Sequence, residues 1–167
     1  MIEINILSKE EVVRLGKEFD CEIIDYGSEP GFEYGICERS SSGREELFSG
    51  IVYELYPNGN LAYYMTVLEG AKHGDSVEFY RSGNLKEFTP MRYGTLTGKS
   101  ISWHDNGNLR SEKVGKYGGV LSFKEWDEDG KLIKEVTEPT ETHRKLMEMN
   151  EKNAKNDVSR QRYRNNP

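Results

Sequence analysis

The chain has 167 residues and a formal net charge of −6, and 31% of its residues are charged while 35% are hydrophobic. This length suits one domain, or one domain with a tail, and the low apolar content predicts a thin core. No segment is apolar enough to span a bilayer, and two cysteines, Cys21 and Cys37, are too few for a disulfide scaffold. Because no secretory leader is recognisable, we expect a cytoplasmic protein.

The charge is distributed unevenly along the chain. Residues 1–69 contain fourteen Asp or Glu against five Lys or Arg, whereas the remainder is slightly basic. A nucleic-acid binder needs a basic surface for its phosphate contacts, so an acidic N-terminal part argues against that class. The same acidity favours a basic protein partner.

The first predicted element is a short strand over residues 3–7. Ser8 and Glu11 then have the spacing of a capping box, in which each side chain accepts a hydrogen bond from the other residue's amide. The helix that begins there carries one apolar stripe, formed by Val12, Leu15 and Phe19. We expect this helix to cover part of the apolar face of a sheet.

Residues 21–49 contain two further apolar runs. Residues 22–25 and 32–37 resemble strands that extend the sheet, and the turn-rich residues 27–31 separate them. Residues 39–44 have the composition of an exposed hairpin tip. We therefore treat residues 1–47 as an N-terminal cap, made of a helix and divergent strands, that precedes the main repeats.

A short phrase recurs four times within residues 48–136. In each copy a large apolar residue precedes a glycine-containing turn and a leucine follows it, as in Leu55 and Leu61. The central glycines are Gly59, Gly83, Gly107 and Gly130, which lie 24, 24 and 23 residues apart. A fixed period in this range is typical of repeat architectures.

Each copy is predicted to be a β-hairpin. Pro57 fixes φ at about −65°, which excludes a type I′ turn and favours a type I turn with Gly59 in the left-handed position of a G1 bulge. With Tyr56 opposite Asn60, strict alternation pairs Tyr53 with Tyr63. A second glycine turn, as in residues 69–74, precedes each next strand. The predicted fold is mainly β: an extended antiparallel meander with one apolar and one polar face.

The aromatic residues, the Asn-Gly-Asn-Leu turn and the Gly-x-x-x-Gly link resemble the variant MORN repeats of the YwqK-type antitoxin family. The resemblance covers residues 48–136. The last copy departs from it because Leu121 stands where Gly50, Gly74 and Gly98 stand in the other copies, so we interpret that copy as a terminal cap. The resemblance implies a meander of hairpin repeats and a bacterial antitoxin role.

The last predicted element is a helix over residues 137–154. Thr137 is a possible N-cap, and Pro139 lies in the first turn, where its missing amide is harmless. Residues 155–167 are polar with scattered arginines, and we predict that they form a disordered tail.

Residue patterns that would indicate catalysis are scarce. The histidines, His73, His104 and His143, have no second ligand at metal spacing, and the glycines lie in hairpin turns rather than before a helix. The acidic residues 127–129 lack the alternating ligands of a calcium loop, which favours a solvated turn. We therefore expect a non-enzymatic protein without cofactor or metal.

The remaining candidates are surface residues. Most tyrosines are expected to fill a thin sheet, but strict alternation places Tyr64 and Phe88 on the polar face beside Glu54 and Glu78. The predicted partner contacts are Glu54, Tyr56, Tyr64, Glu78, Tyr80 and Phe88. The first hypothesis is an antitoxin or immunity protein that occludes the basic active site of a cognate toxin, such as a nuclease. The alternative is a MORN-type scaffold or membrane-associated module, which would need a basic face.

Overall fold

The computed structural model describes residues 4–20, 23–25 and 35–164. Its two helices are α1 (Lys9–Leu15) and α2 (Glu141–Arg164). The strands of the described residues are β1 (Lys17–Glu18), β2 (Ile23–Asp25), β3 (Ile36–Arg39), β4 (Glu45–Leu47), β5 (Gly50–Leu55), β6 (Leu61–Leu68), β7 (Ala71–Phe79), β8 (Leu85–Arg92), β9 (Thr95–Leu96), β10 (Gly98–Trp103), β11 (Leu109–Lys116), β12 (Gly119–Trp126) and β13 (Leu132–Val136).

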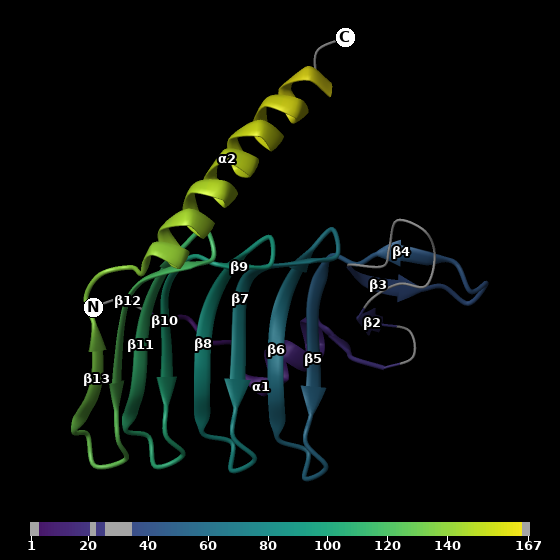
Figure 1. Cartoon of the computed structure of the whole chain (residues 1–167). Helices are drawn as coiled ribbons and strands as arrows, with labels where there is room; N and C mark the ends of the chain where they lie inside the picture. Colours follow the sequence, from purple (N-terminus) through teal and green to yellow (C-terminus); the bar gives the residue numbers. More distant parts are fainter. Residues whose placement is uncertain (1–3, 21–22, 26–34, 165–167) are drawn as a thin grey trace.

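The repeats form one long antiparallel meander, as the sequence predicts. In the described residues the main sheet has ten strands in the order β1-β5-β6-β7-β8-β10-β11-β12-β13, with β9 paired to β8. Consecutive hairpins therefore lie side by side, and the sheet grows by one hairpin per repeat (Figure 1). The edge at β5 is covered by β1, which pairs in parallel. The predicted mainly β fold with a helix near each end is confirmed.

Two kinds of turn alternate along the meander. At one end of the strands, Tyr56 N–H donates to Asn60 O over 2.8 Å, and Gly59 has φ +82°. The glycines predicted at this position all have positive φ, so the G1-type loops are confirmed: Gly59, Gly83, Gly107 and Gly130. At the other end, Glu69 and Gly70 both have positive φ, 49° and 77°, which is the geometry of a two-residue type I′ turn.

The register beyond each loop differs from strict alternation. Leu55 pairs with Leu61 as predicted, but Ala62 is then bulged, and Tyr53 pairs with Tyr64 instead of Tyr63. The same shift follows the leucine of every later copy. Because one extra residue reverses the faces of all residues beyond it, the predicted pairing of Tyr53 with Tyr63 is wrong.

One cross-strand row of apolar residues forms the core on the side that we call the α1 face. Its members are Tyr53, Tyr64, Val77, Phe88 and Ile101. Val12 of α1 is fully buried against this row, and Ile4, Ile6 and Leu7 pack beside it. The row continues as Glu112, Lys124 and Glu135, so the apolar stretch of this row ends at β10.

The helix and the segment before it match the prediction in part. The capping box of Ser8 and Glu11 is confirmed, with Ser8 Oγ accepting from Glu11 N over 3.2 Å. The predicted strand is absent at residues 4–7, and residue 3 lies outside the described residues. The predicted stripe is wrong beyond Val12, because α1 ends at Leu15, which is 52% exposed, and Phe19 packs into a different cluster.

Strands β2, β3 and β4 form a separate sheet and do not extend the main one. Ile23, Ile36 and Phe48 pack on Val52 and Val67, so this small sheet covers the opposite side of β5 and β6. The predicted extension is wrong because these apolar residues cover a face of the main sheet rather than its edge. Both faces are thus covered at the β5 end. The predicted divider at residues 27–31 lies outside the described residues.

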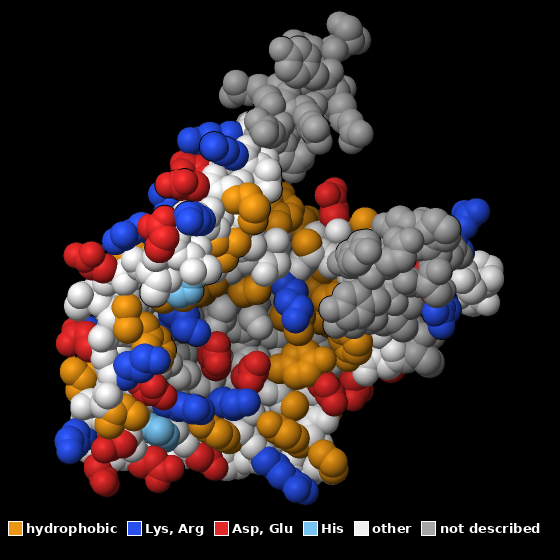
Figure 2. Space-filling view, in the orientation of Figure 1, with side chains coloured by type: hydrophobic (Ala, Val, Ile, Leu, Met, Phe, Trp, Pro, Cys, Tyr) orange, Lys and Arg blue, Asp and Glu red, His pale blue; other side chains and the backbone are white. Residues whose placement is uncertain are grey.

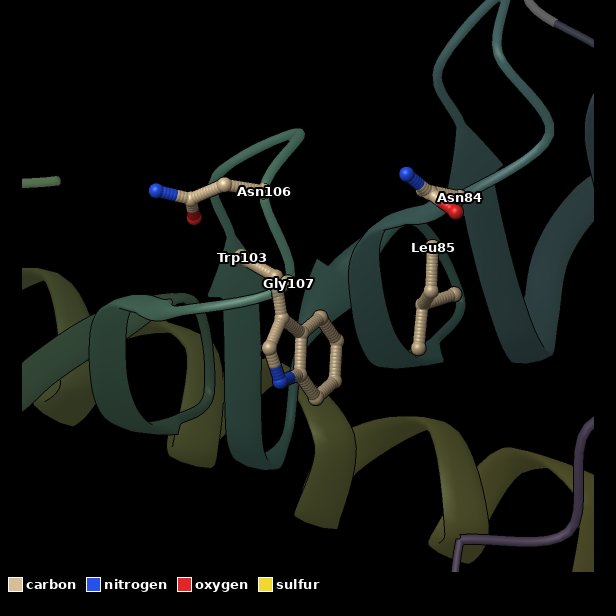
Figure 3. A pocket seen from close by; sticks show the side chains of 5 residues that line it. All are labelled: Asn84, Leu85, Trp103, Asn106 and Gly107. Atoms are coloured by element: carbon tan, nitrogen blue, oxygen red, sulfur yellow. The ribbon is translucent and has the colours of Figure 1, made fainter.

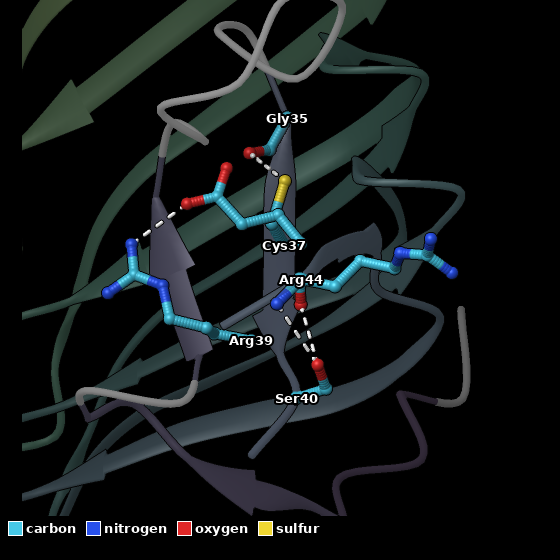
Figure 4. Close-up of polar contacts among 6 residues, drawn as sticks. Gly35, Cys37, Arg39, Ser40 and Arg44 are labelled. Carbon is cyan, nitrogen blue, oxygen red and sulfur yellow. Dashed lines mark hydrogen bonds and ion pairs between the residues drawn. The ribbon is translucent and has the colours of Figure 1, made fainter. Parts of the chain in front are cut away.

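The predicted hairpin tip at residues 39–44 connects β3 and β4. Ser40 N–H donates to Arg44 O over 2.9 Å, which closes the turn. Arg39 forms an ion pair of 2.8 Å with Glu45, whose side chain is almost fully buried (Figure 4). This pairing supplies a partner for a carboxylate that solvent does not reach.

Hydrogen bonds between neighbouring G1 loops form what we call the turn ladder. Asn60 Nδ2 donates to Arg81 O over 3.0 Å, and the asparagines of the next two loops donate to Asp105 O and Glu128 O. Tyr56 and Tyr80 hydroxyls donate to Phe79 O and Trp103 O, and His104 Nε2 donates to Trp126 O. The asparagine of the repeated motif therefore holds each loop to the next one.

The ladder ends at the fourth loop. Asp127 replaces the tyrosine, and its carboxylate accepts from Asp129 N and Lys131 N of its own loop, over 3.1 and 2.8 Å. Lys131 replaces the asparagine. Because this loop lacks the hydroxyl and amide donors that the first two loops direct at the next copy, its sequence agrees with the interpretation of a terminal repeat, and β13 is the edge of the sheet.

Helix α2 packs on the type I′ turn end of β11 and β12 and then projects away from the sheet (Figure 1). Asn150 Nδ2 donates to Tyr117 O over 2.8 Å. A Cβ on Gly119 would lie 2.4 Å from Met147 Cγ, so only glycine allows this close approach. The predicted start at residue 137 with Thr137 as N-cap is wrong: α2 begins at Glu141, and Thr140 Oγ1 accepts from His143 N over 3.3 Å. The helix extends past the predicted end near residue 154 to Arg164, so residues 155–164 of the predicted tail are helical, and residues 165–167 lie outside the described residues.

The carboxyl group of Asp75 should limit stability at neutral pH. Burial raises the pKa of Asp75, so the folded state holds its proton more tightly than the unfolded state does. Ionisation therefore destabilises the fold as the pH rises above the ordinary pKa of aspartate. Asp75→Asn should raise the melting temperature at pH 7, and the gain should disappear in acid. Asp129→Asn, in an exposed loop, is the control; an equal gain there would contradict the prediction.

Candidate functional site

A second cross-strand row lies on the side of the sheet opposite to α1, which we call the polar face. Through the register, Glu54 pairs with Tyr63, Tyr63 with Glu78, and Glu78 with Glu87. The row continues through Ser102, Ser111, Glu125 and Lys134. We call its first four members, Glu54, Tyr63, Glu78 and Glu87, the acidic row. Three carboxylates and one tyrosine thus lie together across β5–β8.

The structure places the predicted contacts on two different faces. Glu54 is exposed and Glu78 is half-buried in the acidic row, as expected. Tyr64 and Phe88 are only 1% and 8% exposed, and both belong to the core of the α1 face. The prediction that they lie on the polar face is therefore wrong, because the bulges at Ala62 and Lys86 reverse their direction.

Tyr56 and Tyr80 serve the turn ladder. Both side chains are half-buried, and their hydroxyls donate to backbone carbonyls of the next repeat over 2.9 and 2.8 Å.

A positive charge lies beside the acidic row. Lys86 forms an ion pair of 2.8 Å with Glu78. The hydrogen bond to Glu78 raises the pKa of Lys86, so this lysine stays charged and partly neutralises the acidic row.

A hollow of about 290 Å³ adjoins the acidic row. Its wall combines apolar side chains from three parts of the chain with polar groups of β7: Phe19, Ile36, Tyr63, Met65, Lys72, Ser76 and Glu78. Tyr63 and Glu78 belong to both the row and the hollow. In Figure 1, α1 lies behind the sheet, so the viewer looks at the polar face. Figure 2 shows this face in the same orientation, with charged side chains of both signs on the floor of a hollow. This combination can hold an apolar or aromatic side chain beside a cation.

A second hollow, of about 240 Å³, lies between two G1 loops. Trp103 and Leu85 point to the same side of it, while Asn84 and Asn106 lie at the loops (Figure 3). The amides of both asparagines already donate to carbonyls of the following loop. Its polar groups are therefore engaged in the turn ladder, and the hollow beside the acidic row is the better candidate site.

In the described part of the chain, no cluster of three or more His, Cys, Asp or Glu side chains could hold a metal ion. In the same residues, neither helix combines the length and the apolar character that crossing a bilayer requires.

Sequence reasoning missed Tyr63, Glu87, Phe19 and Met65. Strict alternation from Leu61 assigns Tyr63 to the apolar face. The apolar spacing carries a signal for the bulge: Leu61 and Tyr64 are three residues apart, as are Leu85 and Phe88. In a strand, two residues that share a face are separated by an even number, so a spacing of three indicates one inserted residue.

Comparison with known proteins identifies the repeats. The family model described as a MORN repeat variant matches residues 72–87, 96–116 and 121–137, which fall in β7–β8, β9–β11 and β12–β13. The first hairpin, β5–β6, lies outside these matches. No curated protein and no solved structure matches the chain. The matched stretches are consistent with a scaffold or interaction module.

Proposed function

We propose that this protein is a cytoplasmic, non-enzymatic antitoxin or immunity protein that binds and occludes a cognate bacterial protein toxin. The observation that carries the proposal is the acidic row beside the hollow of about 290 Å³ on the polar face. The resemblance to the YwqK-type family supplies the biological setting. A toxin with a basic active-site surface, such as a nuclease, would fit the charge of the row.

The row and the hollow would act at different stages of binding. Carboxylates on an exposed face attract a basic partner and raise the association rate, while an anchored side chain in the hollow slows dissociation. Glu54 is exposed and thus accessible for the first role, and Tyr63 with Met65 forms an apolar wall for the second. The turn ladder keeps the strands in register, so little ordering is needed on binding.

Reversing the charge of the acidic row should weaken toxin binding. In Glu54→Lys/Glu78→Lys we expect affinity for the toxin to fall by at least about tenfold, since each close charge pair contributes a measurable coupling. The measurement is co-expression with the product of the adjacent gene, scored by host growth and recovery of a stable complex, followed by titration of the purified pair.

The control for this experiment is Glu128→Lys/Asp129→Lys, which makes the same charge change in the exposed fourth loop. It should leave rescue and affinity unchanged. If the adjacent gene product is not toxic and forms no complex, the antitoxin role is refuted. If a complex forms but both double variants bind normally, the acidic row is not the contact surface.

A scaffold or membrane-associated module is the second candidate. The observation that favours it is the MORN variant match itself, together with lysines at the β13 end of the polar face. Co-sedimentation of the full chain with anionic liposomes separates the two functions. Binding to these liposomes without rescue from any toxin would support the scaffold role.

A further inference from the structure

Some lysines of the main sheet are ion-paired and others are not. Lys86, Lys99 and Lys124 each form an ion pair with a glutamate. Lys113 and Lys134 form no ion pair with any described residue, and their ammonium groups lie 5.9 and 5.4 Å from the centroid of the Phe123 ring. Two positive charges therefore lie at one aromatic ring, and neither is ion-paired with a carboxylate of the described residues.

These three residues, Lys113, Phe123 and Lys134, form what we call the basic-aromatic patch. Lys113 pairs with Phe123 across β11 and β12, and Lys134 pairs with Glu125, the second residue beyond Phe123. All of them share the polar face, because Glu125 and Lys134 belong to the row that begins at Glu54. Glu125 is the nearest acidic position in the register, but it makes no ion pair with Lys134.

The polar face is thus electrically divided. Its β5–β8 half carries the acidic row, and its β10–β13 half carries the basic-aromatic patch. In the first half, the charge of Lys86 is neutralised by its ion pair with Glu78. The ammonium groups of the patch have no such partner among the described residues and remain available to an anion. Cations placed over an aromatic face are preorganised, so a carboxylate that pairs with them meets little ordering cost.

We propose that the basic-aromatic patch binds an acidic segment of a polypeptide. Carboxylates of the segment pair with Lys113 and Lys134, and an apolar side chain between them contacts the half-buried ring of Phe123. A nucleic acid fits less well, because it needs many phosphate contacts and a basic surface, whereas this chain carries a net charge of −6. The patch is independent of the toxin proposal, which rests on different residues.

The test uses a short fluorescein-labelled oligoglutamate peptide and the full chain, with binding measured by fluorescence anisotropy in low-salt buffer. Lys113→Gln/Lys134→Gln should weaken binding by roughly tenfold, since each exposed charge pair contributes a few-fold. Added salt should weaken the wild-type complex as well. Thermal melting checks that the variant is folded.

The matched control is Lys99→Gln/Lys124→Gln, which removes the same charge from the α1 face and should change binding by less than about twofold. Three outcomes overturn the proposal: no binding of the peptide, an equal loss in both double variants, or tighter binding of a labelled oligothymidylate of the same length. The last outcome would assign the patch to nucleic acid. None of these outcomes bears on rescue from the toxin.

Discussion

Tyr64→Ala should destabilise the protein by about 3–5 kcal/mol, the usual cost of truncating a large buried side chain. Tyr64 is 1% exposed, contacts the Phe79 ring at a centroid distance of 6.4 Å, and accepts a hydrogen bond from Leu7 N over 3.1 Å. Its loss would therefore open a cavity in the core and release the N-terminal segment. Urea unfolding followed by tryptophan fluorescence measures the effect.

The neighbouring residue provides the control. Tyr63 is half-buried on the polar face, so Tyr63→Ala should cost much less stability while weakening binding of a partner at the hollow. The two variants test the observed register against strict alternation. Strict alternation would place Tyr63 in the core and Tyr64 on the polar face. If Tyr63→Ala were the more destabilising of the two, the bulge at Ala62 would be wrong.

Removing the asparagines of the turn ladder should destabilise the protein by about 2–3 kcal/mol, because each net hydrogen bond contributes about 1 kcal/mol or somewhat less at an exposed site. The triple variant is Asn60→Ala/Asn84→Ala/Asn108→Ala, which deletes bonds of 3.0, 2.7 and 2.7 Å to the next loop. Equilibrium unfolding in urea measures the loss, and single variants test whether it is additive.

Lys131→Ala is the matched control for the ladder, since Lys131 occupies the same position in the fourth loop without a following copy. Its side chain is exposed, so its replacement should change stability by less than about 0.5 kcal/mol. A triple variant as stable as Lys131→Ala would show that the loops are held by the strands alone.

The repeat and the turns were predictable because both follow from local chemistry. Pro57 and Gly59 restrict the backbone of the first loop, and a period of 24 residues fixes where the next loop falls. The small sheet was not predictable, because the positions of Ile23 and Ile36 over Val52 depend on contacts between distant segments. The ladder was also missed, since its donors and acceptors are separated by a full repeat.

The candidate site was predictable only in its charge. Glu54 and Glu78 were found because acidic residues stand out on a polar strand. The prediction for Tyr64 is wrong because one bulged residue, Ala62, reverses the direction of every side chain beyond it in the strand. The strand propensities of the residues do not reveal such an insertion. The spacing of three between Leu61 and Tyr64 is the sequence feature that indicates it.

The direction of the turn ladder bears on how such proteins change length in evolution. Each inner loop both offers donors to the following loop and supplies carbonyls to the preceding one, as the loop of His104 does. A duplicated inner unit would therefore join its neighbours with every bond repeated. A copy added after the fourth loop would meet Asp127 and Lys131 in place of the aromatic and asparagine donors of the ladder. Lineages should accordingly gain or lose whole inner hairpins, while the last one stays in place.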